Sequence, residues 1–222
     1  MPTQTTTYDQ LASQLSAVFD IFVSDQKYWI GLAGSPGSGK STVAEAIRRR
    51  MPEKVTVVSM DGYHYYRRQL DTMEEPEKAY ARRGAPFTFD AERLVDELRL
   101  ARQKGAASFP SFDHNIGDPV EQDIELRPGK QVVIVEGNYL LLDESPWASL
   151  KKDVFDETWF LDVDVAECRR RVENRHVGTG LTREEARHRV STNDGPNAEL
   201  VRDASLKNAS QIVRIDSPVN EA

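Results

Sequence analysis

The stretch of sequence that decides the fold runs from residue 34 to residue 42 and reads Gly34-Ser35-Pro36-Gly37-Ser38-Gly39-Lys40-Ser41-Thr42. It matches the phosphate-binding pattern Gly-x4-Gly-Lys-Ser/Thr at every fixed position. Glycines let such a loop turn its backbone amides inward, and the start of the next helix adds partial positive charge. We therefore expect these residues to bind a nucleoside triphosphate, with Lys40 at the β- and γ-phosphates and Ser41 on Mg²⁺.

The flanking sequence supports this interpretation. An apolar run at residues 28–33 precedes the loop, and a helical pattern at residues 41–50 follows it. A glycine-rich turn that only joins a strand to a helix is the alternative, but Lys40-Ser41-Thr42 in register disfavours it.

Further apolar runs alternate with amphipathic segments along the chain. We predict five strands, at residues 28–33, 55–60, 131–136, 158–163 and 212–215. Helical spacing of apolar residues marks residues 8–23 and 41–50, the stretch between Asp90 and Gly105, and residues 166–176 and 182–190. Strands that are apolar on both faces and alternate with helices indicate an α/β fold with a parallel sheet covered on both sides.

Three segments do not follow this alternation of strands and helices. Residues 62–128 are rich in Tyr, Arg, Pro and charge, and we expect an inserted or edge module there. Residues 164–192 are rich in arginine and are expected to form a mobile lid. Residues 1–7 lack an apolar pattern and are expected to be a short disordered lead. We interpret residues 1–222 as a single domain.

Composition excludes several classes of function. The 222 residues carry 29 Lys+Arg and 36 Asp+Glu, a net charge of −7, which argues against a nucleic-acid-binding protein. The one cysteine, Cys168, cannot form an intramolecular disulfide and fits a reducing compartment, so we expect a cytoplasmic protein. The apolar runs are far shorter than the ~20 residues of a membrane span, so no membrane association is expected.

Two predicted strands end in a carboxylate, Asp61 after residues 55–60 and Glu136 at the end of residues 131–136. Ligands of open α/β sheets bind beyond the carboxyl ends of the strands, where the loop at residues 34–42 also lies. One carboxylate can hold Mg²⁺, and a second can accept a proton from an attacking hydroxyl. The alternative is that either acid caps a helix or pairs with an arginine.

Four further motifs accompany these residues: residues 59–64 (Ser-Met-Asp-Gly-Tyr-His), residues 83–90 (Arg-Gly-Ala-Pro-Phe-Thr-Phe-Asp), residues 109–114 (Phe-Pro-Ser-Phe-Asp-His) and residues 136–139 (Glu-Gly-Asn-Tyr). With the phosphate loop, they make the chain resemble the phosphoribulokinase/uridine kinase family of P-loop kinases, which includes pantothenate kinases. The resemblance is strongest to a branch described as nucleoside-kinase-like or fructose-transport-associated, and it extends from about residue 29 to residue 215.

The resemblance implies a P-loop NTPase fold with a five-stranded parallel sheet, and phosphoryl transfer from ATP to a hydroxyl group. The family's general base corresponds to Asp61, which also lies near the metal, and its Mg²⁺ ligands correspond to Ser41, Asp61 and Glu136. The family's lid arginines correspond best to Arg171 and Arg175, and less securely to Arg169 and Arg170. A solvated helix face that makes surface ion pairs is the alternative for these arginines.

The substrate side departs from the uridine kinase pattern. Those enzymes carry Phe-Asp-His-Pro where this chain has residues 83–86 (Arg-Gly-Ala-Pro), so the acid that recognises ribose is missing. Arg83 could instead bind an anionic or polyol substrate, or pair with a surface acid. We expect His64, Asp113 and His114 to contact substrate, with packed or surface histidines as the alternative. Residues 193–197 are interpreted as a helix-starting turn rather than as the border of an adenine site.

Together these features predict an ATP- and Mg²⁺-dependent kinase acting on a small hydroxyl compound that is sugar-, nucleoside- or pantothenate-like. The alternative is a regulatory P-loop ATPase that has no small-molecule acceptor. Dimers are common in this family, so a homodimer stays open.

Overall fold

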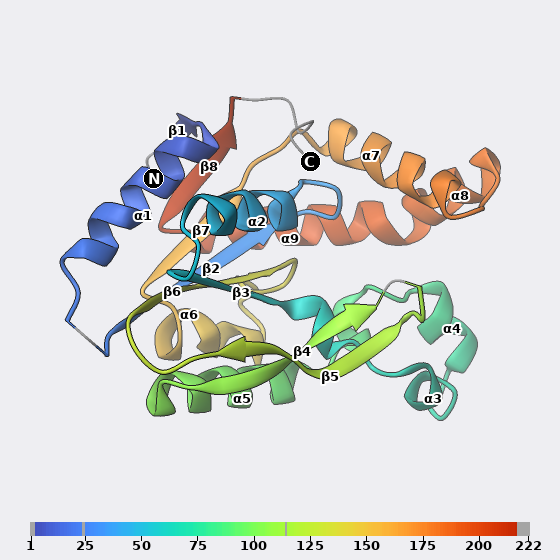
Figure 1. Cartoon of the computed structure of the whole chain (residues 1–222). Coiled ribbons are helices and arrows are strands. Elements are labelled where there is room, and N and C mark those ends of the chain that lie inside the picture. Colours follow the sequence, from blue (N-terminus) through green and yellow to red (C-terminus); the bar gives the residue numbers. More distant parts are fainter. Residues whose placement is uncertain (1–2, 24, 114, 217–222) are drawn as a thin grey trace.

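A six-stranded parallel sheet forms the centre of the molecule (Figure 1). The computed structural model describes residues 3–23, 25–113 and 115–216, apart from the side chains of Thr3 and Gln4. The strand order is β1-β8-β7-β2-β6-β3. The strands are β1 (Thr3–Thr6), β2 (Lys27–Gly34), β3 (Val55–Ser59), β6 (Gln131–Gly137), β7 (Glu157–Leu161) and β8 (Gln211–Ile215). The predicted α/β fold is confirmed, but the sheet has six strands rather than five.

The additional strand is β1, which lies where a disordered lead was expected. Thr3–Thr6 pairs in parallel register with β8, and the carbonyl of Thr6 accepts a 3.0 Å hydrogen bond from the backbone N–H of Asp216. Thr7 then caps helix α1 (Tyr8–Asp20), because its hydroxyl accepts the N–H of Gln10 at 3.2 Å. The sequence prediction was wrong here because a run of polar threonines has no apolar alternation, although β-branched residues suit a strand.

Helices cover both faces of the sheet (Figure 1). One face carries α1 and α2 (Lys40–Arg50), and the other carries α5 (Ala91–Lys104) and α6 (Leu150–Asp153). Successive side chains of β6 point to opposite faces of the sheet. Val132 and Ile134 pack in the hydrophobic core under α1 and α2, whereas Val133 and Val135 pack in the core under α5 and α6. Because every residue of β6 is buried, its apolar run continues without a polar face.

The interrupting segment at residues 62–128 contains short helices, α5 and an antiparallel hairpin. The short helices are the 3-10 turns Met60–Tyr63 and Pro86–Thr88, with α3 (Arg67–Leu70) and α4 (Pro76–Ala81) between them. Helix α5 begins and ends as predicted, with Asp90 as its N-cap and Gly105 in the left-handed region at φ 71°. The hairpin pairs β4 (Ala107–Asp113) with β5 (Asp118–Leu126), and its register shifts at Pro110, which has no N–H to donate.

The arginine-rich segment folds into a helical arm. Helix α7 (Val165–Gly178) begins at its cap Asp164, and α8 (Arg183–Arg189) runs through a π turn (Val190–Asp194) into α9 (Gly195–Asn208). A further 3-10 turn, Trp147–Ser149, precedes α6. In Figure 1, α7 and α8 extend beyond the edge of the sheet. None of the helices in the described part of the chain is long and apolar enough to cross a bilayer.

Candidate active site

The phosphate loop joins β2 to α2. Gly37 and Gly39 both adopt left-handed backbone conformations, with φ of 83° and 90°, and Lys40 is the first residue of α2. Gly37 also lies directly against α7, because a Cβ at this position would collide with the carbonyl of Cys168 and the side chain of Val172. The loop therefore has the geometry of a phosphate cradle, and the arginine-rich arm packs on it.

The two strand-end carboxylates lie close to this loop. Ser59 at the end of β3 and Glu136 near the end of β6 are paired in register, and the Ser59 hydroxyl donates a 2.7 Å hydrogen bond to Glu136 Oε1. Burial raises the pKa of Glu136, against the opposing effect of the Lys40 charge. The Asp61 charge raises this pKa further, whereas hydrogen bonds from the Ser59 and Ser41 hydroxyls lower it. Lys40, Asp61, Ser41 and Ser59 are thus the groups that act on the Glu136 carboxylate.

Asp61 is held by the segment that connects the sheet to the hairpin. It lies in the 3-10 turn Met60–Tyr63, and its backbone N–H donates to Ser59 Oγ at 3.3 Å. The next residue is glycine because β4 passes directly over it: a Cβ at Gly62 would collide with the carbonyl of Pro110. The hairpin therefore fixes the backbone immediately after Asp61.

The oxygen atoms near Lys40 suit a hard divalent cation brought by a phosphate ligand. Ser41, Asp61 and Glu136 offer a hydroxyl and two carboxylates, the donors that Mg²⁺ prefers. In the part of the chain that the structure describes, no three His, Cys, Asp or Glu side chains gather into a metal site. Mg²⁺ commonly takes one or two protein carboxylates and completes its shell with water and phosphate oxygens, so the residues present fit it.

A cavity of about 480 Å³ opens beside the phosphate loop. Pro36 of the loop, Asp61 and Arg175 of α7 line it, together with His64 and Arg83 from the inserted segment. Residues predicted from four separate stretches of sequence are thus brought to one cavity. Its remaining lining residues are Gly84, Phe89, Phe112, Gly117, Asn138, His176, Thr179, Arg189, Asp194 and Asn197.

Aromatic rings fix the two predicted substrate residues that line the cavity. The imidazole of His64 stacks on Phe89, with ring centroids 3.9 Å apart. The Arg83 guanidinium lies 5.6 Å from the centroid of Phe112 and donates to the carbonyl of Tyr65 at 3.3 Å. It also makes a 3.4 Å contact with Asp118, and burial lowers the pKa of Arg83.

Asp113 is not among the residues that line this cavity. Its carboxylate accepts the backbone N–H groups of Asn115 at 2.7 Å and Ile116 at 3.3 Å, so it holds the turn of the hairpin. His114, the other residue expected from this motif, lies outside the described residues.

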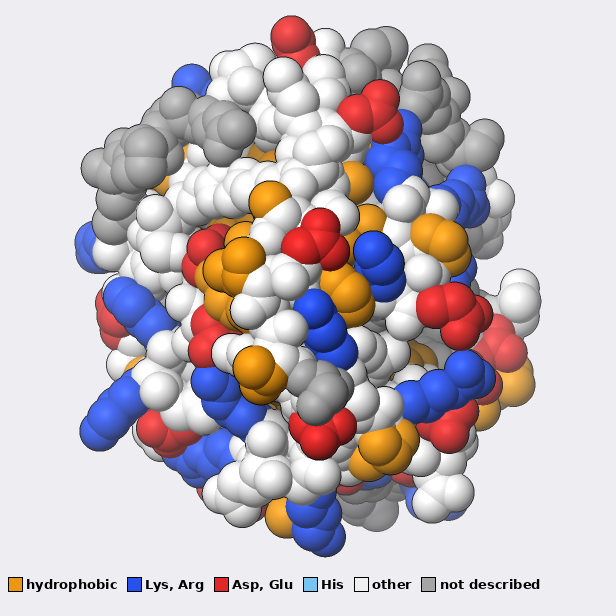
Figure 2. Space-filling model, turned by 60° about the vertical axis from the view of Figure 1, so that its left-hand side comes forward, with side chains coloured by type: hydrophobic (Ala, Val, Ile, Leu, Met, Phe, Trp, Pro, Cys, Tyr) orange, Lys and Arg blue, Asp and Glu red, His pale blue; other side chains and the backbone are white. Residues whose placement is uncertain are grey.

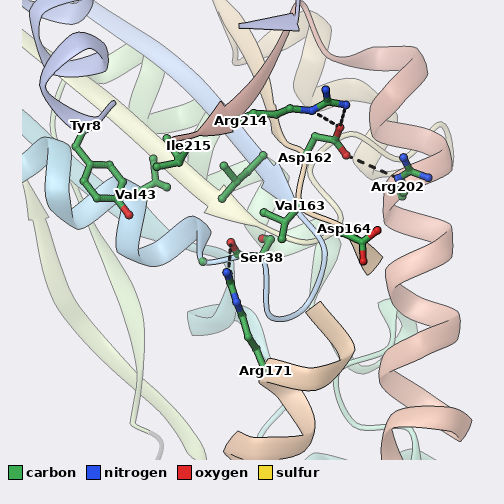
Figure 3. A pocket seen from close by; sticks show the side chains of 12 residues that line it. Tyr8, Ser38, Val43, Asp162, Val163, Asp164, Arg171, Arg202, Arg214 and Ile215 are labelled. Carbon is green, nitrogen blue, oxygen red and sulfur yellow. Dashed lines mark hydrogen bonds and ion pairs between the residues drawn. The ribbon is translucent and has the colours of Figure 1, made fainter. Parts of the chain in front are cut away.

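A second cavity, of about 400 Å³, is lined by other residues of the phosphate loop and is drawn in Figure 3. Ser38, Gly39 and Val43 line it from the loop and α2. On its far wall, Asp162 binds Arg214 at 2.6 Å. Arg171 lines this cavity rather than the first one, and its Nη1 donates to the carbonyls of Gly37 and Ser38 at 3.4 Å.

Cys168 lies under the loop as a packed thiol. It is 1% exposed, and burial raises its pKa to about 11, so the neutral form is the stable one near neutral pH. Cys168 is therefore poorly suited to act as a nucleophile.

Sequence reasoning missed several polar residues of the first cavity and its wall, among them Arg189, Asn138, Asn193 and Asn197. Asn193 and Asn197 were expected in a helix-starting turn. They are 1% and 2% exposed and bind the 82–84 segment instead: Asn193 Oδ1 accepts from Arg82 Nε at 3.0 Å, and Asn193 Nδ2 donates to the carbonyl of Arg83 at 3.0 Å. Asn193 lies in the π turn and Asn197 in the first turn of α9, and their burial depends on tertiary contact and has no local signal.

The fold and the site together define a nucleotide-binding P-loop protein with a separate cavity beside its phosphate loop. Residues 29–177 match the Phosphoribulokinase / Uridine kinase family. The chain belongs to this family, which confirms the resemblance drawn from its motifs.

Individual relatives and solved structures are similar to the chain over most of its length. The chain is 40% identical over 203 residues to the Schizosaccharomyces pombe protein named "Putative uridine kinase C227.14", covering 87% of this chain and 85% of that one. A crystal structure of a "putative fructose transport system kinase" from Silicibacter sp. TM1040 matches with a TM-score of 0.76 and 32% identity, over 91% of this chain and 98% of that one. The fold of YFH7 from Saccharomyces cerevisiae matches with a TM-score of 0.79 at 20% identity, over 96% and 100%.

On the face shown in Figure 2, acidic and basic side chains are interspersed with small hydrophobic patches. The net charge of the chain is −7. An anion site in this protein would therefore depend on individual arginines rather than on an overall positive field.

Proposed function

We propose that this protein is an ATP-dependent kinase that transfers the γ-phosphoryl group of ATP to a hydroxyl of a small sugar-, nucleoside- or pantothenate-like molecule. The observation that carries the proposal is the arrangement of the two cavities. One is lined by Ser38 and Gly39, and the other by Pro36 together with Asp61. A donor bound in the cavity at Ser38 and Gly39 and an acceptor bound in the cavity at Asp61 would meet at the phosphate loop, which lines both, as in-line transfer requires.

The loop and Lys40 bind the triphosphate in this proposal. Backbone amides of residues 34–42 solvate the phosphate oxygens, and the Lys40 ammonium pairs with the β- and γ-phosphates. The second cavity, walled by Asp162 and Arg214, takes the nucleoside part. These groups are fixed before the substrate binds, so little reorganisation is needed during transfer.

Asp61 acts on the acceptor. It lies in the cavity beside Pro36 and accepts the proton of the acceptor hydroxyl while that oxygen forms its bond to the γ-phosphorus. The bond from the γ-phosphorus to the bridging β-phosphate oxygen breaks, and the leaving group is ADP. No covalent intermediate on the protein is required, which agrees with the neutral, buried thiol of Cys168.

Ser41, Asp61 and Glu136 hold the metal ion in this proposal. When bound with the triphosphate, Mg²⁺ neutralises charge that develops on the phosphate oxygens. The unusual position of Glu136, buried but beside Lys40, is explained if a cation completes its charge balance.

The arginine-rich arm covers the reaction. Arg175 lines the acceptor cavity and stabilises the transferred phosphoryl group, whereas Arg171 lies over the loop carbonyls on the nucleotide side. Closure of this arm excludes water, which favours transfer to the acceptor over hydrolysis.

The acceptor panel should reflect the names of the relatives without assuming any of them. The S. pombe relative is named as a uridine kinase and the Silicibacter one as a fructose transport system kinase. In this chain Gly84 stands where uridine kinases carry the ribose-binding acid, and Arg83 lies next to it, so we rank sugars, sugar acids and pantothenate above pyrimidine nucleosides.

Measurement of ADP release with and without each acceptor tests the proposal, with mass spectrometry of the phosphorylated product. We expect at least one acceptor to stimulate ADP release and to gain one phosphoryl group. Unchanged ATP hydrolysis across the whole panel would instead favour a regulatory P-loop ATPase.

A further inference from the structure

Two arginines in the arginine-rich arm differ from the others in having no acidic partner. Five arginines of α7 and α8 are paired with glutamates: Arg169 with Glu199, Arg170 and Arg171 with Glu167, and Arg183 and Arg187 with Glu173. Arg175 and Arg189 make neither an ion pair nor a side-chain hydrogen bond to any residue within 3–23, 25–113 and 115–216. Both line the cavity that contains Asp61.

The local sequence explains why these two guanidinium groups stay unpaired. Arg170 and Arg171 have Glu167 three and four residues before them, whereas Arg175 has Val172 and Arg171 at those positions. Arg189 does have Glu185 four residues before it. However, Glu185 is committed to the cap of α8, where it accepts the backbone N–H of Thr182 at 2.8 Å and its hydroxyl at 2.7 Å.

Neither acid that lines the cavity, Asp61 or Asp194, forms an ion pair with Arg175 or Arg189 in the described part of the chain. Asp194 is bound by His176 at 2.9 Å, and Asp61 is assigned to the acceptor hydroxyl and the metal in the proposed function. Arg83 adds a third guanidinium to the lining. Its Nη2 makes only long contacts to Tyr65 O and Asp118, of 3.3 and 3.4 Å, and its buried Nε has no hydrogen-bond partner in the described part of the chain.

The positions of the arginines divide them into two groups. On α7, Arg175 follows Cys168 and Val172 on the same helical face, and those two residues contact Gly37 of the phosphate loop. Arg175 thus lies on the face of α7 that packs against the phosphate loop. Arg83 and Arg189 come from segments that contact each other, because Asn193 Nδ2, four residues after Arg189, donates to the carbonyl of Arg83 at 3.0 Å.

We infer that the acceptor carries an anionic group, a carboxylate or a phosphate monoester, in addition to the hydroxyl that is phosphorylated, and that Arg83 and Arg189 bind this group. The inference rests on the proposed function, since it assigns a substrate class to the same cavity. Guanidinium groups bind planar carboxylates and phosphates through paired hydrogen bonds, and a partly desolvated site strengthens them.

One further atom fits a polyhydroxy acid. Asn138 Oδ1 is buried in the cavity wall and has no hydrogen-bond donor in the described part of the chain. A second hydroxyl of the acceptor would supply that donor. Phe89 and Phe112 limit the remaining width of the cavity.

Matched pairs of acceptors that differ only in the anionic group test the inference. Carboxylate pairs are D-glycerate with glycerol and pantothenate with panthenol; phosphate pairs are fructose 6-phosphate with fructose and ribulose 5-phosphate with ribulose. Each is assayed for ADP release and product with the full chain, wild type and Arg189→Gln. The control is Arg187→Gln, which removes the same charge from the same helix but from a residue paired with Glu173 outside the cavity.

We expect one acid to exceed its neutral partner in kcat/KM by at least about tenfold, the scale of one charged hydrogen bond. Arg189→Gln should raise the KM of that acid by about tenfold and remove the preference for the acid over its neutral partner. Arg187→Gln should leave the KM and the preference at their wild-type values. A preference within the carboxylate pairs indicates that the site binds a carboxylate, and a preference within the phosphate pairs indicates that it binds a phosphate monoester. Equal use of a neutral partner, or equal effects of the two variants, overturns the inference while the observed transfer still supports the kinase.

Absence of transfer to every acceptor is a different result and contradicts the proposed function. In that case the melting temperature decides the anion site, measured with each acid in the presence of Mg²⁺ and a non-hydrolysable ATP analogue. A rise that Arg189→Gln abolishes and Arg187→Gln retains supports the site. No rise with any of the acids overturns it.

Discussion

The hydroxyl of Ser59 donates a 2.7 Å hydrogen bond to the carboxylate of Glu136, and the two residues are register partners at the ends of the neighbouring strands β3 and β6. This bond fixes a buried carboxylate at the position where Lys40 and Asp61 act on it. The sheet therefore holds an acid whose charged form is costly for folding, at the place where a cation is needed for the proposed reaction.

Replacement Glu136→Gln should increase stability and reduce activity. Burial raises the pKa of Glu136, so the folded state favours the neutral form. The wild-type protein consequently loses stability as the pH rises from the unfolded-state pKa, ~4.3, through the folded-state pKa, and the loss is complete above it. Glutamine stays neutral, so the melting temperature of the variant should exceed that of wild type at pH 7 to 8, and the difference should shrink toward pH 4.

In the same variant, phosphoryl transfer at saturating acceptor should fall roughly 10- to 100-fold, the scale of a lost metal-site interaction. Higher Mg²⁺ concentrations should recover part of the activity. An unstable variant with normal activity would show that Glu136 serves the fold alone.

Replacement Lys40→Ala should lower kcat by roughly 100-fold or more, on the scale of losing one preorganised charge-stabilising group. The substitution also removes the positive charge that opposes the rise in the pKa of Glu136. Steady-state kinetics and MgATP titration calorimetry measure the effect, with Lys104→Ala at the end of α5 as the control. Near-normal turnover would remove Lys40 from the proposed mechanism.

Replacement Asp61→Asn should keep MgATP binding and lose most of the transfer. The amide has nearly the same shape but cannot accept the hydroxyl proton, and general-base catalysis contributes about 10²- to 10⁴-fold. Asp123→Asn, on the exposed part of β5, is the matched control. Full transfer by Asp61→Asn, with its identified acceptor, would show that another group takes the proton.

How far the sequence predicts this site depends on the range of the interactions. The phosphate loop, the strand-end acids Asp61 and Glu136, and the cap of α5 at Asp90 depend on neighbours in the chain, so their patterns are visible in the sequence. The hairpin of β4 and β5 is not, because its strands contain Pro110 and Pro119 and most positions of β5 are exposed.

The arginines of α7 and α8 also show that features which depend on distant parts of the chain cannot be predicted from local sequence. Their abundance predicts an arginine-rich arm, but which of them face the cavity depends on helical phase and on tertiary partners such as Glu173 and Glu199. Arg189 was missed for this reason. A search for arginines that lack an acid three or four residues away, or whose acid is used in a cap, would have found Arg175 and Arg189.

Removal of β1 should destabilise the protein. A chain that starts with methionine before Thr7 lacks the strand that pairs with β8, and it loses the hydrogen bond between Thr6 and the N–H of Asp216. For a domain of this size each kcal/mol corresponds to about 2–4 °C, so we expect a fall of several degrees in melting temperature. A melting temperature equal to that of the full chain would restore the interpretation of residues 1–7 as a disordered lead.

Replacement Asn193→Ala should separate acceptor binding from nucleotide binding. The Asn193 side chain is 1% exposed and joins the arm to the segment that carries Arg83, accepting from Arg82 Nε and donating to the Arg83 carbonyl. Alanine leaves both partners unsatisfied, which costs about 1–3 kcal/mol. Since Gly84, next to Arg83, also lines the cavity, the KM of the acceptor should rise while the KM of MgATP stays unchanged. Asn174→Ala, on the exposed side of α7, is the control, and equal rises in both KM values would mean that Asn193 supports the fold generally rather than the acceptor wall.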